Sequence, residues 1–191
     1  MKNLLQILLF GIALSGFSQT IGIKGGLNLG KEKATASGIT ITSQTNTSFM
    51  VGLYSEYETS EDLFFSPELI FSIDGGKFEF FGASATDRFT YISAPLLMKY
   101  YATEKFSLHA GPQIGVLLKG ESEVDGMKED FKEFVKPLNL SFDFGAEVHL
   151  SALNFGFRYV LGLSNLNDAP DLDGKIRLNS VQIYLAFPLT F

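Results

Sequence analysis

Apolar residues alternate with polar or small ones along two neighbouring runs between residues 138 and 163. In the first run every even position from 138 to 150 is apolar, and the odd positions between them are polar or small. A period of two is typical of a β-strand with one apolar and one polar face. Only Ser151 and Ala152 join the two runs, which predicts a β-hairpin. Each strand is about 11 to 13 residues long, a length that suits a tilted membrane crossing.

The same pattern predicts eight strands in the whole chain. They cover about 20–30, 47–58, 63–73, 87–101, 105–118, 138–150, 153–163 and 179–191. The links are short at 59–62, 102–104 and 151–152, and long at 31–46, 74–86, 119–137 and 165–178. Outer-membrane barrels have short turns on one rim and long loops, outside the cell, on the other. The sequence therefore predicts an all-β fold, an eight-stranded antiparallel up-and-down transmembrane β-barrel.

The outer face of this barrel is too apolar for water. An unbroken apolar stripe would lie along the seventh strand, formed by Phe155, Phe157, Tyr159, Leu161 and Leu163. A soluble ligand-binding barrel with eight up-and-down strands is the less favoured alternative.

The first 18 residues resemble a secretory signal peptide. Lys2 supplies a positive start, residues 4–14 an apolar stretch, and Gly16 and Ser18 the small residues of a cleavage site. Cleavage near Ser18/Gln19 would leave a barrel domain of residues 19–191. The outer membrane is therefore the expected location.

Charge and cysteine content exclude several kinds of protein. The formal net charge is −6, whereas a nucleic-acid surface needs a basic face, so no nucleic acid is expected as a partner. The chain has no Cys, which excludes a disulfide framework and a thiolate metal site. No cofactor is expected.

The predicted hairpin turn fixes which residues of strands six and seven face each other. Residues whose numbers add up to 303 are paired, so Arg158 lies opposite Gly145. From there its long side chain reaches Asp143 and Glu147 on the diagonal.

Two histidines join this polar face. The same register places Asn154 opposite His149, and a symmetric loop between strands five and six would place His109 opposite Glu147. The expected lumen network comprises Glu56, Glu68, His109, Asp143, Glu147, His149 and Arg158, with Lys24 and Lys99 as further cations.

This network has two interpretations. A histidine beside a carboxylate is a general-base pair, which would suit a lipid-modifying enzyme. Alternatively, the charges are paired because they are removed from water, and they fill an interior just wide enough for side chains. The second interpretation is favoured, so neither histidine is expected to be catalytic.

Three other motifs are weaker. Residues 25–31 spell G-x-x-x-x-G-K, but Glu32 stands where a phosphate-binding loop needs Ser or Thr. Residues 168–174 are similar to a calcium loop but lack its first ligand, which favours an acidic turn. Residues 121–134 have helical apolar spacing and are predicted to form a helical or mobile external loop.

Three segments resemble one known family. They are I-G-I-K-G-G-L-N-L at 21–29, Y-I-S-A-P-L-L-M-K-Y-Y at 91–101 and F-D-F-G-A-E-V at 142–148. With the signal peptide, they look like the PorT-like outer-membrane β-barrel proteins of Bacteroidetes. The resemblance implies membrane, topology and size rather than an activity. Its named member serves protein secretion, and no functional residue carries over.

The last strand resembles the assembly signal of bacterial barrels, which implies the barrel-assembly machinery as a partner. The signal residues are Tyr184, Ala186, Phe187, Leu189 and the terminal Phe191. Pro188 departs from the pattern, because proline removes a ladder donor and is confined to an edge or a bulge.

Together these features predict a non-enzymatic small outer-membrane barrel. Its expected role is binding, adhesion or accessory work in envelope assembly or secretion, with a protein partner at the external loops and lipid around the barrel. A lipid-modifying enzyme and a soluble ligand-binding barrel are the alternatives.

Overall fold

The computed structural model describes residues 20–36, 38–80, 83–124, 126–168 and 174–189. Its elements are β1 (Thr20–Ala36), β2 (Ile39–Thr42), β3 (Gln44–Ser60), β4 (Leu63–Phe80), β5 (Ala83–Thr103), β6 (Phe106–Val124), β7 (Met127–Asp130), the 3-10 helix η2 (Lys132–Phe134), β8 (Leu138–His149), β9 (Asn154–Gly162) and β10 (Gly174–Leu189). Within these ranges no helix is long and apolar enough to cross a membrane.

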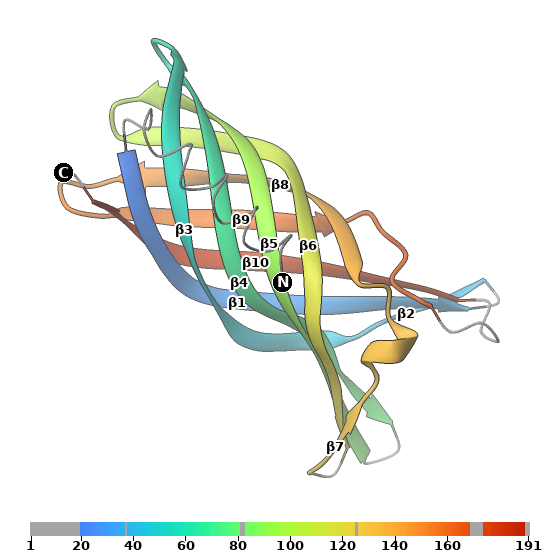
Figure 1. Ribbon diagram of the computed structural model, residues 1–191. Coiled ribbons are helices and arrows are strands. Elements are labelled where there is room, and N and C mark those ends of the chain that lie inside the picture. The colour runs from blue at the N-terminus through green and yellow to red at the C-terminus, as the bar shows by residue number, and fades with distance from the viewer. Residues whose placement is uncertain (1–19, 37, 81–82, 125, 169–173, 190–191) are drawn as a thin grey trace, which may run out of the picture.

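Eight of these strands pair into a closed ring. Figure 1 shows the resulting barrel. The order is β1, β3, β4, β5, β6, β8, β9, β10, and every pairing between neighbours is antiparallel. Strand β10 returns to β1 and pairs with it at every position from Ile21 to Ala36, which closes the barrel and removes its edges. The predicted eight-stranded antiparallel up-and-down barrel is confirmed.

The two faces of the strands separate apolar from polar residues. Along β8 the even-numbered positions Leu138, Leu140, Phe142 and Phe144 are exposed, whereas the residues between them at 139, 141 and 143 are polar and buried. The other strands follow the same arrangement, which is the reverse of that in a soluble protein. Large apolar side chains form an outer belt, and polar ones fill the lumen. A surface of this kind is suited to lipid rather than water.

The predicted long links are mostly strand, which corrects the sequence-based boundaries. The links at 31–46, 74–86 and 119–137 contain the ends of β1, β4, β5 and β6 together with β2 and β7. Gly38 and Gly126 take φ angles of 81° and 82°, a left-handed conformation that lets the chain reverse sharply. In Figure 1 the β1–β2 ribbon and the β6–β7 ribbon project from the same end of the barrel and diverge.

The prediction of a helical loop at 121–134 is wrong for most of that segment. It forms the end of β6, the hairpin strand β7 and one short turn, η2. The hairpin is set by Gly126 and by cross-strand pairs from Glu121↔Asp130 to Val124↔Met127. Asp-Gly at 125–126 is a strong hairpin signal, and it outweighs the helical spacing of the apolar residues.

Strand β10 begins at Gly174, five residues before its predicted start at 179. Pro188 pairs with Gly22 of β1, but the pairing of β10 with β9 ends at Ala186, so the proline has an edge position on that side. The signal peptide with its cleavage site, most of the calcium-like loop and Phe191 lie outside the described residues.

Two rims result, and each has its own connections. The short-turn rim holds the connections at 61–62, 104–105 and 150–153, together with the first residue of β1 and the end of β10. The long-loop rim holds the tips of the hairpins and the link between β9 and β10.

Candidate functional site

All eight barrel strands contribute polar side chains to one network in the lumen. The contributors are Lys24 of β1, Glu56 of β3, Glu68 of β4, Lys99 of β5, His109 of β6, Asp143 and Glu147 of β8, Arg158 of β9 and Tyr184 of β10, all of them buried. Three cations thus face four carboxylates. Period-two alternation places each of these side chains inside, because its chain neighbours point outward.

Arg158 lies at the centre of the network and is fully buried. Its Nη1 and Nη2 donate to the two carboxylate oxygens of Glu68 at 2.9 and 2.8 Å, a bidentate pair. Its Nη1 also lies 3.7 Å from Oδ2 of Asp143. Its Nε donates to Nε2 of His109 at 3.3 Å, so the histidine accepts from a cation rather than serving a carboxylate.

The two lysines link the remaining carboxylates. Lys24 Nζ lies 2.7 Å from Glu68 and 3.7 Å from Glu147. Lys99 Nζ lies 2.6 Å from Glu147 and also forms an ion pair with Glu56. Ion pairs therefore run without a break from Glu56 to Arg158, so each buried charge has an opposite charge beside it.

Tyrosine rings fill the space around the charges. Tyr184 donates its hydroxyl to Glu147 at 2.7 Å, and its ring lies 4.6 Å from Nζ of Lys24. Glycines make room for such rings: a Cβ on Gly156 would overlap the ring of Tyr184, and one on Gly22 would overlap another buried tyrosine ring. In the 25–31 motif, a Cβ on Gly30 would overlap the backbone of Gly75, so close packing on the inner face accounts for this glycine without a phosphate-binding loop.

The predicted hairpin register is present. Arg158 pairs with Gly145 and Asn154 with His149 across the two-residue turn. The predicted register of His109 is wrong by two residues. His109 lies opposite Gly145, because the link from β6 to β8 is not symmetric: it contains β7 and η2.

The main partner of Arg158 was missed by sequence reasoning. Glu68 lies on β4, across the lumen from β9, and no local rule pairs these strands. Tyr184 was also missed, although the alternation of β10 places it on the polar face.

His149 lies apart from this centre, at the short-turn rim. Its Nε2 is 2.8 Å from the hydroxyl of Ser107, and its ring stacks on Tyr101 with centroids 4.9 Å apart. Tyr101 in turn donates to Glu56 at 2.9 Å. A hydroxyl beside a histidine is the arrangement of a serine nucleophile and its base, but Ser107 has no exposed surface at all.

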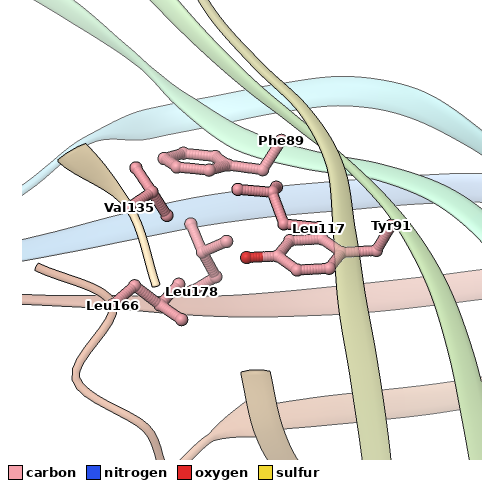
Figure 2. Packing of buried hydrophobic residues seen from close by; sticks show 6 residues of the cluster. All are labelled: Phe89, Tyr91, Leu117, Val135, Leu166 and Leu178. Carbon is pink, nitrogen blue, oxygen red and sulfur yellow. The ribbon is translucent and has the colours of Figure 1, made fainter. Parts of the chain in front are cut away.

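An apolar plug closes the lumen toward the long-loop rim. Figure 2 shows its six residues packed together: Phe89, Tyr91, Leu117, Val135, Leu166 and Leu178. Val135 and Leu166 come from the links after η2 and after β9, and the backbone N–H of Lys136 donates to the carbonyl of Leu166 at 2.9 Å. The described lumen is thus occupied by two layers, one polar and one apolar.

Residues 17–168 match a family model described as the outer membrane protein beta-barrel domain. The chain belongs to this family. As an outer-membrane barrel, it exposes its apolar belt to lipid, which overturns the soluble alternative. Short turns of such barrels face the periplasm and long loops face outside, so the hairpin ribbons are external.

Solved structures of outer-membrane proteins share this fold. Ail, the attachment invasion locus protein of Yersinia pestis, has a TM-score of 0.53 and 16% identity, covering 89% of this chain and 98% of Ail. Neisserial surface protein A has a TM-score of 0.53 and 12% identity, covering 86% of this chain and 96% of its own. The outer membrane enzyme PagL has a TM-score of only 0.40 at 12% identity, covering 85% and 99%, which is too low to bear on activity. No curated protein has significant sequence similarity to the chain.

Proposed function

We propose that this outer-membrane barrel is a non-enzymatic binding protein that acts through its external ribbons. The observation that carries the proposal is that the polar network and the apolar plug fill the lumen. Other molecules therefore meet the outer surface of the barrel. The ribbons extend well past the lipid-facing belt and expose apolar side chains at their tips: Ile39 is 68% and Met127 71% exposed. Adhesion fits such a surface, and Ail, which shares the fold, is an attachment invasion locus protein. Accessory work in envelope assembly or secretion fits the same surface.

Trimming one ribbon tests this proposal. The β6–β7 hairpin is paired in register from Glu121↔Asp130 outward, so replacing residues 122–129 by Asn-Gly keeps the pairing of β6 with β5 from Arg88↔Glu121 inward and its pairing with β8. Gram-negative cells carrying the full-length or the trimmed protein are compared for attachment to epithelial monolayers and for proteins captured by photo-crosslinking at Ile39, which both proteins retain. The matched control is Glu104→Ser, an exposed change in a short turn on the opposite rim.

Loss of attachment on trimming, with the barrel still folded, supports adhesion. Loss of a specific crosslinked envelope protein supports the accessory role. If trimming changes neither and the control behaves the same way, the β6–β7 ribbon is not the binding surface and the proposal fails for that ribbon.

The lipid-modifying enzyme is the second candidate, and one observation favours it: the 2.8 Å contact between Ser107 and His149. The complete burial of Ser107 argues against it, since a nucleophile must reach its substrate. Release of fatty acid from outer-membrane lipid by the purified protein, abolished in both Ser107→Ala and His149→Gln while they remain folded, would establish the enzyme. We expect no such release, and His149→Gln should lower only the stability.

Three finer assignments belong to the same proposal. The segment resemblances support membership of the PorT-like group of Bacteroidetes, and the pattern before Gln19 supports signal-peptide cleavage at Ser18/Gln19. The pattern of Tyr184, Ala186, Phe187, Leu189 and Phe191 supports recognition by the barrel-assembly machinery. N-terminal sequencing of the membrane-extracted protein tests the signal-peptide cleavage. A protein that retains Met1 would refute cleavage at Ser18/Gln19.

A further inference from the structure

The outer faces of β1 and β10 change from apolar to basic at the same level. On β1 the outward residues are apolar up to Leu29, and Lys31 and Lys33 follow them. On β10 the outward residues from 189 back to 181 are apolar, and Arg177 and Lys175 lie beyond Asn179. The register pairs Lys33 directly with Arg177 and Lys31 with Asn179. Four cations therefore gather where the lipid-facing belt ends on the external side.

These cations lack the carboxylate partners that Lys77, Arg88 and Lys119 have at the same rim. Like charges directly opposite each other on neighbouring strands destabilise a sheet. Three other cations at this rim each have a carboxylate: Lys77–Glu79 at 3.0 Å, Arg88–Glu123 at 2.5 Å and Lys119–Glu121 at 2.7 Å. Among the residues that the structure describes, no carboxylate lies within 4.0 Å of Lys31, Lys33, Lys175 or Arg177.

The basic group surrounds a concave surface. A pocket of about 290 Å³ is lined by Lys33, Thr35, Thr40, Lys175 and Arg177. The hydroxyls of Thr35 and Thr40 lie 3.0 Å apart and hydrogen-bond to each other, so the pocket offers hydroxyl as well as cationic donors. Its lining is suited to an anion with several oxygens, such as a phosphate group.

An apolar groove lies lower on the same seam. It has a volume of about 370 Å³, and its outward lining is Gly25, Leu27, Phe155, Ile183 and Leu185. Gly25 pairs with Leu185, and because glycine has no side chain the outer surface is indented there. Lys33 lies eight residues further along β1, about 26 Å along the strand, so pocket and groove follow one line across the belt.

We propose that the β1–β10 seam binds a phosphate-bearing acylated lipid of the outer leaflet. The phosphate lies in the pocket between Lys33 and Arg177, and an acyl chain follows the seam toward the groove at Gly25. A free soluble anion would need only the pocket. A lipid explains both parts, because the cations begin where the apolar belt stops.

Binding of lipid A to the purified full-length protein in zwitterionic nanodiscs tests this proposal, with dephosphorylated lipid A as the comparison. The test variant is Lys33→Gln/Arg177→Gln. The matched control is Lys77→Gln/Lys119→Gln, which removes the same charge from ion-paired lysines at the same rim. Each cation near an anionic surface contributes about fivefold to affinity, so the test variant should bind lipid A about 30-fold more weakly. The control should change affinity less than about threefold.

Leu27→Trp at the groove separates the two parts of the site. It should weaken binding of lipid A, but not the ability of inorganic phosphate to protect Lys33 from acetylation. Equal affinity for lipid A and its dephosphorylated form, or equal loss in test and control variants, overturns the proposal. Competition by millimolar inorganic phosphate as effective as that by lipid A would show a free-anion site and overturn the assignment to lipid.

Discussion

Arg158 is the residue on which the lumen network depends most. Arg158→Met would leave Glu68 and Asp143 buried beside an apolar side chain, and breaking a buried pair in this way costs about 3–5 kcal/mol. Urea titration of the protein refolded into bilayers should show this loss in the free energy of unfolding. Arg177→Met, an exposed arginine at the rim, is the control and should cost about 0.5 kcal/mol or less. Wild-type stability of Arg158→Met would show that the network does not support the fold.

Glu32 is buried on the inner face of β1, above the lipid-facing belt. Burial, and then the neighbouring Asp87 carboxyl, raise the pKa of Glu32 to about 8 from 4.5. The folded state therefore holds a proton that the unfolded chain has released, and stability falls as the pH rises from about 4.5 through 8. Glu32→Gln should flatten this part of the pH profile and stabilise the protein above pH 8 relative to wild type. A pH profile identical to that of wild type would contradict this.

In strand β9, the alternation of apolar residues with polar or small ones determines which face of the strand points to the lipid. Phe157 is 48% exposed on the lipid face, whereas Gly156 and Arg158 on either side are buried. Phe157→Arg should cost about 2–4 kcal/mol near the bilayer midplane, while Leu163→Arg, at the rim after the same strand, should cost about 0–1 kcal/mol. Both values come from unfolding in vesicles of equal thickness. Equal costs for the two variants would mean that the membrane boundaries lie elsewhere.

At the scale of the whole molecule, the polar network and the apolar plug should keep the barrel closed. An eight-stranded interior has little more room than its own side chains need. The purified protein in planar bilayers should give no steady conductance, and neither should Leu166→Ala, which weakens only the plug by about 2–5 kcal/mol. Large, regular channel steps from a monomer would show that the two layers do not seal the lumen.

Local patterns were sufficient for much of this architecture. Alternation along β8 and β9, with a two-residue turn between them, predicts both strands, their faces and the pairing of Arg158 with Gly145. The same alternation predicts which side chains enter the lumen, because a strand turns successive residues to opposite faces whatever lies around it. It did not predict the external ribbons, because the apolar residues of 121–134 have helical spacing, the alternation at 39–42 is only four residues long, and both chain reversals depend on Gly38 and Gly126.

Contacts between strands that are distant in the ring were decided by barrel closure. Arg158 and Glu68 are 90 residues apart and face each other only because eight strands close with one particular stagger. The seam that brings Lys33 beside Arg177 and the plug that joins Val135 to Leu166 arise in the same way. Sequence alternation sets the direction of each side chain, which is a local property. The partner that each side chain meets depends on the relative position of whole strands, which only the closed barrel defines.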